Sequence, residues 1–267
     1  MKTRLFVAAV GIPALIYVIL RAHIVVITAA LALLAGIAGW ELQTCVSGGE
    51  NRFLALTTAV LSAFALICHS ADVAALRNVL FLTLTVLFAY AIAQSGRVRF
   101  DQISAVVFSC TLTAGSFAAF IRMASAGAGR ICLLLPFVLS FACDTGAYFI
   151  GKRFGKHKLS PKVSPHKTVE GSIGGMAGNL LGGLVFAFLW NRFFNGQVSY
   201  GIMAALSLVC GVTAQIGDLS FSLIKREYGI KDYGHLFLEH GGVLDRFDSV
   251  LFVAPVIELV LTLSRVL

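Results

Sequence analysis

The chain has 267 residues, of which 58% are hydrophobic and only 13% are charged. That charged fraction is about half of what a soluble domain carries, so the composition excludes an ordinary soluble protein and indicates a membrane protein. The formal net charge of +8 does not require nucleic acid as a partner. A basic excess in membrane loops holds the topology and attracts anionic lipid or nucleotide phosphates.

Apolar blocks of the length that crosses a bilayer as a helix follow one another along the chain. Their expected bounds are 5–20, 24–42, 53–68, 79–94, 105–121, 131–150, 172–190, 202–224 and 250–266. No clear small-residue cleavage site follows the first block, so we interpret it as a transmembrane helix rather than a signal peptide. The pattern predicts an all-α polytopic membrane protein with about nine transmembrane helices.

The distribution of lysine and arginine predicts the orientation of these helices, because cytoplasmic loops carry the positive excess. With a cytoplasmic N-terminus, most of the 21 basic residues fall on the cytoplasmic side, including those of two charge-rich loops, 151–171 and 225–249. We therefore expect both loops to lie on one cytoplasmic face.

Acidic residues divide the chain by function. Of the 13 acidic residues, only Glu41, Glu50, Asp72 and Asp101 precede residue 140. We expect residues 1–130 to form a scaffold of hydrophobic helices that could carry an oligomer surface, and residues 131–267 to form the catalytic region. Within 172–190, glycines stand four residues apart at positions such as Gly174 and Gly178, a spacing that favours close helix packing in lipid.

Asp144 and Asp218 lie inside apolar blocks, where an ionised group is costly unless it has a partner or a function. Asp144 is either a structural residue near a helix end or a functional one, and we favour function. Asp218 would share a helix face with Ser222 and Lys225, about 10 Å deeper than the lysine at 1.5 Å rise per residue. A structural ion pair is the alternative for Asp218.

Asp245 and Asp248 stand at i and i+3 in the segment "DRFD" and could share a helix face. With Asp218 they offer three hard oxygen ligands, which suit Mg²⁺ and similar ions that also bind phosphate. Gly241 and Gly242 permit positive φ and could turn their amides toward a phosphate, or simply form a turn. His240 could donate to phosphate or cap that turn, and the sequence leaves both open.

The loop 151–171 carries six basic residues opposed only by Glu170. Such a cluster suits a polyphosphate or an anionic headgroup, although it could also anchor the topology. Carboxylates suited to a metal, cations suited to phosphate and a polar cleft at one membrane face together indicate phosphoryl or nucleotidyl transfer to a lipid. That chemistry depends on positioning and charge neutralisation and needs no nucleophilic side chain.

The segment from Ser222 to Asp248, "SLIKREYGIKDYGHLFLEHGGVLDRFD", closely resembles the signature of the phosphatidate cytidylyltransferases. The stretch "DTGAYFIGKRFGKHKLSPKVSPHKTVEG" from Asp144 to Gly171 is similar to a second region of that family. The resemblance covers roughly residues 144–248, whereas the N-terminal helices are similar only in hydropathy.

The resemblance implies a Mg²⁺-dependent nucleotidyltransferase that converts CTP and phosphatidate to CDP-diacylglycerol and diphosphate, with a second cation left open. It implies metal binding by Asp218 and Asp245, with catalytic roles for Asp144, Lys225, Arg226 and Asp248. The substrate-binding residues that it implies are Ser164, Lys167, Thr168, Glu170, Ser222, Lys231, His240, Gly241, Gly242 and Arg246.

It further implies a homodimer in the lipid bilayer. The compact length and the lack of a targeting extension suggest a bacterial cytoplasmic (inner) membrane, and the distribution of lysine and arginine predicts an active site on the cytoplasmic side. Two alternatives remain. A CTP-dependent polyprenol or lipid kinase would deliver the γ-phosphate instead of the nucleotide. An ion-coupled membrane transporter would line its path with Asp144 and Asp218, but would leave the phosphate-binding constellation unexplained.

Overall fold

The computed structural model describes residues 16–264 apart from 72, 95–96, 126–128, 195, 235 and 237–240. The chain divides into two compact units. Of the described residues, unit 1 holds 22–122 and 227–246, and unit 2 holds 16–21, 123–226 and 247–264.

Unit 1 is built mainly from long apolar helices. They are α2 (Ile24–Ser47), α3 (Arg52–Ala71), α4 (Val73–Ala93), α5 (Phe100–Phe108), the π-helical η1 (Ser109–Thr113) and most of α6 (Ala114–Ser125). Small residues bring α2 and α3 together, because a Cβ at Gly39 would lie 2.6 Å from the Ser62 hydroxyl oxygen. Large side chains such as Leu42, Leu54 and Phe117 are fully buried in this unit.

Unit 2 holds the remaining helices and a small hairpin. Its elements are η2 (Arg130–Leu134), α7 (Leu135–Phe154), β1 (Lys158–Ser160), β2 (Ser164–Thr168), α8 (Val169–Phe193), most of α9 (Tyr200–Glu227) and most of α10 (Leu244–Ser264). The two strands pair antiparallel, with Lys158 opposite Thr168 and Ser160 opposite Ser164.

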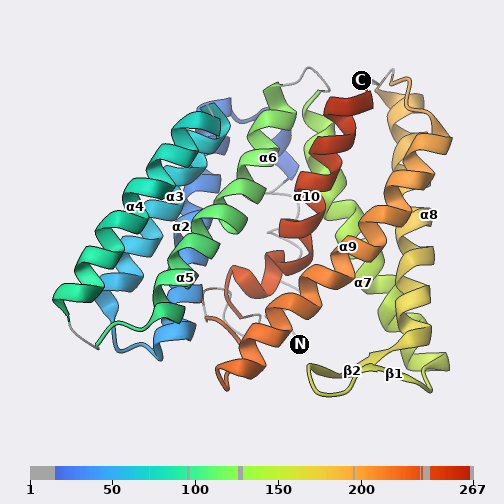
Figure 1. Ribbon diagram of the computed structural model, residues 1–267. Helices are drawn as coiled ribbons and strands as arrows, with labels where there is room; N and C mark the ends of the chain where they lie inside the picture. The colour runs from blue at the N-terminus through green and yellow to red at the C-terminus, as the bar shows by residue number, and fades with distance from the viewer. Residues whose placement is uncertain are drawn as a thin grey trace. The chain divides into compact units, whose positions relative to one another are not determined.

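The glycine spacing of α8 has the packing role that the sequence predicts, since α7 and α8 run side by side (Figure 1). A Cβ at Gly146 of α7 would lie 2.4 Å from the Gly174 carbonyl oxygen, and one at Gly178 would lie 2.5 Å from the Ala142 carbonyl oxygen. Only glycine permits this approach of the two backbones, and it holds the hairpin-bearing ends of α7 and α8 together.

The all-α membrane architecture is confirmed at the level of its helices. Among the described residues, five helical segments are long and apolar enough to cross a membrane: Ile24–Ser47, Phe100–Ser125, Arg130–Phe154, Val169–Phe193 and Tyr200–Glu227. Each predicted block from 24–42 onward lies within or largely overlaps a helix, whereas most of the block 5–20 lies outside the described residues.

Two local expectations need correction. The segment 151–171 is not only a loop, because it contains the end of α7, the hairpin and the start of α8. Likewise, α10 begins at Leu244, six residues before the predicted block, so the segment 225–249 is not a loop to its end. Asp245 and Asp248 belong to this helix, as their spacing of three residues had suggested. The predicted block was chosen by its hydropathy and therefore began after the charged residues. A helix, however, tolerates charged residues in its first turn.

Candidate active site

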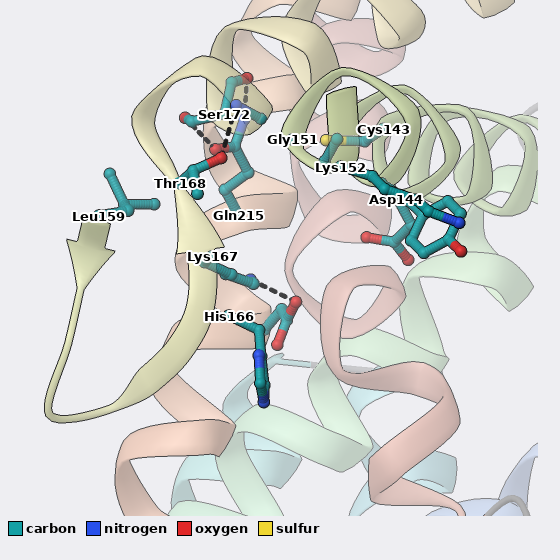
Figure 2. Close-up of a pocket in the computed structure, with 14 residues that line it drawn as sticks. Cys143, Asp144, Gly151, Lys152, Leu159, His166, Lys167, Thr168, Ser172 and Gln215 are labelled. Carbon is teal, nitrogen blue, oxygen red and sulfur yellow. Dashed lines mark hydrogen bonds and ion pairs between the residues drawn. The ribbon is translucent and has the colours of Figure 1, made fainter. Parts of the chain in front are cut away.

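A pocket of about 550 Å³ opens in unit 2 between α7, the hairpin, the start of α8 and α9 (Figure 2). Four of the predicted site residues line it: Asp144, Lys167, Thr168 and Asp218. Its size lies in the range of pockets that bind small molecules. The predicted site residues Ser164 and Glu170, both described, do not line it.

The pocket contains an ion pair between Lys167 of β2 and Asp218 of α9 (Figure 2). The side chains are 27% and 24% exposed, so the pair is only partly screened by water. Ser222, one turn further along α9, donates to the other carboxylate oxygen of Asp218 at 3.4 Å. The ion pair that the sequence left open as a structural alternative for Asp218 is thus present. It lies in a pocket that is also lined by a second cation, Lys152, and a second carboxylate, Asp144.

The hairpin that carries Lys167 is held in place by the first turn of α8. Thr168 is the N-cap of α8, and its hydroxyl accepts from the Gly171 amide at 3.1 Å. Glu170 accepts from the amides of Lys156 at 3.0 Å and His157 at 3.2 Å, and contacts the His157 ring at 2.6 Å. Glu170 therefore shapes the hairpin from outside the pocket.

Two carboxylates of unit 2, Asp218 and Asp144, act electrostatically on a third, that of Asp248. Burial of its carboxyl group, and then the negative charge of Asp218, raise the pKa of Asp248 to about 7, and Asp144 contributes to the same rise. The positive charge of Lys225 acts in the opposite direction. Ionised carboxylates gathered in this way favour a bound cation, which would relieve their repulsion.

The basic end of α9 also contacts the hairpin. The Arg226 guanidinium donates from Nε to the carbonyl oxygen of Val163, which immediately precedes β2, at 3.3 Å. Lys225 is half-buried and Arg226 is exposed. Cations from the end of α9 therefore belong to the same unit as Lys167 and its pocket.

In unit 1 the signature loop, the segment of the signature between α9 and α10, holds Asp245 by hydrogen bonds from backbone amides. One carboxylate oxygen accepts from the amides of Tyr233 at 2.8 Å and Gly242 at 3.0 Å. Gly241 has a φ of 83°, a backbone conformation that glycine permits. The Gly242 amide is thus engaged with Asp245, and phosphate binding by this pair stays a prediction. Lys231 and Arg246 are exposed, and His240 lies outside the described residues.

Several residues of the site were not predicted from the sequence. Ser172 of α8 and Gln215 of α9 line the pocket and bond to each other, and the Gln215 amide also donates to the Ser172 carbonyl at 3.2 Å. A signal existed, since Gln215 stands three residues before Asp218 and shares its helix face. Glu41 was also missed, although an acid in an apolar block meets the criterion that selected Asp144.

Within the described part of the chain, no group of three or more His, Cys, Asp or Glu side chains is arranged to hold a metal ion. The two residues predicted as metal ligands belong to different units, Asp218 to unit 2 and Asp245 to unit 1. The chemistry of the donors fits a hard divalent cation, because Asp144 and Asp218 offer carboxylate oxygens in one pocket.

Residues 2–264 match the model of the cytidylyltransferase family. A phosphatidate cytidylyltransferase from Staphylococcus aureus (strain COL) is 31% identical over 179 residues, which cover 67% of this chain and 66% of that protein. A phosphatidate cytidylyltransferase from Bacillus subtilis (strain 168) is 33% identical over 178 residues, which cover 66% of this chain and 65% of the relative. The matches thus span just under two thirds of these relatives, and the resemblance predicted from the signature is confirmed.

Proposed function

The chain belongs to the cytidylyltransferase family, a family of nucleotidyltransferases, and from this premise we propose that it joins CTP to phosphatidate in phospholipid biosynthesis. The products are CDP-diacylglycerol and diphosphate. The names of the S. aureus and B. subtilis relatives support this choice of substrates.

The observation that carries the proposal is the pocket in which Lys167 and Asp218 meet beside Asp144. A cation, two carboxylates and the Thr168 cap line one space at the end of helices that are apolar enough to cross a membrane. This combination suits a site that binds a polyphosphate beside a lipid headgroup. The cation neutralises phosphate charge, and the carboxylates can bind a metal ion that does the same.

In the proposed reaction an oxygen of the phosphatidate phosphate attacks the α-phosphorus of CTP. The new P–O bond forms as the bond from the α-phosphorus to the oxygen that bridges to the β-phosphate breaks, and diphosphate leaves with that electron pair. The cations proposed to bind phosphate oxygens are Lys167, Lys225, Arg226, Lys231 and Arg246. Ser164, Thr168, Glu170 and Ser222 shape the site, and His240, Gly241 and Gly242 complete it.

We propose that a divalent cation, Mg²⁺, is held by Asp218 and Asp245, with Asp144 and Asp248 in support. When bound, the ion supplies charge neutralisation to the phosphate groups. Asp218 would exchange its contact with Lys167 for the ion, which releases the lysine toward a phosphate. The carboxylates of Asp144 and Asp218, which line one pocket, support a cation here.

The proposed setting is the cytoplasmic membrane of a bacterium, with nine spans, a cytoplasmic N-terminus and the active site on the cytoplasmic side. The excess of lysine and arginine in segments 151–171 and 225–249 supports this orientation. We also propose that two copies associate as a homodimer, as the resemblance to the family implies.

The test uses purified protein with Mg²⁺, phosphatidate and CTP labelled on the α- or the γ-phosphate. We expect label in lipid only from α-labelled CTP. Transfer of γ-label to a polyprenol or other lipid would instead identify a kinase. No label in lipid from either CTP, together with nucleotide-independent ion flux in proteoliposomes, would favour a transporter.

A further inference from the structure

Glu41 lies on α2, far from the signature in sequence, yet its side chain contacts the signature loop. It is only 5% exposed. Its two carboxylate oxygens accept from the amides of Val243 and Leu244, each at 2.9 Å. All three residues belong to unit 1. The bonds therefore join α2 to the point at which α10 begins.

The position of these bonds matters because of what α10 carries. The first amides of a helix have no partner within the helix, and a carboxylate that accepts from them is also favoured by the helix dipole. Asp245 lies in the first turn of α10, and Asp248 follows one turn later. Glu41 thus fixes the start of the helix that presents both aspartates.

Two glycines of the signature leave room for the same carboxylate. A Cβ at Gly242 would lie 2.2 Å from Oε1 of Glu41, and a Cβ at Gly234 would lie 2.7 Å from it. Gly242 also donates its amide to Asp245. The loop therefore encloses Glu41 on one side and holds Asp245 on the other.

We propose that Glu41 is a positioning residue for catalysis: through the amides of Val243 and Leu244 it sets the first turn of α10, and with it the carboxylate of Asp245. The role rests on the proposed nucleotidyl transfer. Residues that hold a catalytic group without touching substrate act through geometry, so their loss lowers turnover more than substrate binding.

The first experiment compares Glu41→Gln with Glu50→Gln, the same change at an exposed carboxylate of unit 1. Glutamine offers one oxygen and turns an N–H₂ toward an amide that needs an acceptor. We expect the kcat of Glu41→Gln to fall about 10- to 100-fold, with little change in the KM for CTP and parental behaviour in Glu50→Gln. An unchanged kcat, or a change confined to KM, would overturn the proposal.

A second set of variants tests whether Glu41 acts through the loop. Gly242→Ala forces its Cβ against the Glu41 carboxylate, whereas Glu41→Asp withdraws that carboxylate by one methylene. We expect the double variant to lose no more activity than the worse single variant, because both changes affect one contact. Losses that multiply would show independent residues and would contradict the role.

Hydrogen exchange gives a readout that does not depend on activity. We expect the amides of residues 243–246 to exchange faster in Glu41→Gln while α3 keeps its parental protection. Fast exchange across α3 as well would mean that Glu41 stabilises unit 1 as a whole, and would overturn the positioning role. If the parent transfers no label from CTP, the proposed function fails, whereas the exchange comparison still tests the contact between Glu41 and α10.

Discussion

The ion pair between Lys167 and Asp218 joins β2 to α9 while both side chains line the pocket. Because Lys167 is also proposed to bind phosphate, Lys167→Gln removes a charge-assisted bond worth about 1.5–3 kcal/mol. We expect kcat/KM for CTP to fall about 10- to 100-fold, as measured by steady-state transfer to phosphatidate.

The matched control is Lys158→Gln on the same hairpin, since Lys158 is exposed and its ammonium donates to the Pro165 carbonyl at 2.7 Å. Its kcat/KM should stay near that of the parent. Equal losses in the two variants would mean that hairpin charge alone matters, and not the pocket position of Lys167.

Asp248 carries a prediction about pH. Its pKa is raised from 3.8 to about 7 by burial and by Asp218, so the folded state binds more protons than the unfolded state between those values. Folding stability without metal should therefore fall as the pH rises through this window. Asp248→Asn removes this contribution, so its melting temperature should depend less steeply on pH than that of the parent.

Melting curves in a chelator, from acid to mildly alkaline pH, measure this difference. Added Mg²⁺ should narrow the difference in pH dependence between parent and variant, because a cation near Asp218 offsets the repulsion between Asp218 and Asp248. Turnover of Asp248→Asn should fall about 10- to 100-fold, in the range found when groups around a metal are removed. Identical pH dependence in parent and variant would contradict the carboxylate grouping.

At the scale of elements, the seam between α7 and α8 depends on glycine. Gly146→Ala places a Cβ 2.4 Å from the Gly174 carbonyl oxygen, so the helices must separate, at a cost of about 1–3 kcal/mol. The control is Gly201→Ala near the start of α9, which is exposed and whose Cβ would meet only the Ser199 hydroxyl oxygen at 3.8 Å. Thermal unfolding in detergent should show a lower melting temperature for Gly146→Ala alone.

The same seam shows which features of the fold could be predicted from the sequence. Helix spans and glycine spacing depend on local composition, so they were predictable for α2 to α9. The hairpin was not, because β1 has only three residues and β2 contains Pro165. The start of α10 was missed for its charges, and the contact of Glu41 was missed because it joins residues 202 positions apart. Tertiary contacts of that kind leave no periodic signal.

At the scale of the whole molecule, the proposed orientation makes a prediction about access. With the N-terminus inside, the segment around Lys162 faces the cytoplasm and the segment between α8 and α9, which contains Ser199, faces outward. A membrane-impermeant maleimide applied to intact cells should therefore label Ser199→Cys but not Lys162→Cys. Permeabilised cells should label both variants.

The native thiols allow this measurement, because each of the six is buried or half-buried. A positive charge does little for orientation once it is far from a span, so the basic residues beside the end of α7 are expected to set the side on which the hairpin lies. Labelling of Lys162→Cys in intact cells would show that the topology is the inverse of the proposed one. The pocket would then open away from the cytoplasmic CTP, and the proposed reaction could not proceed in that orientation.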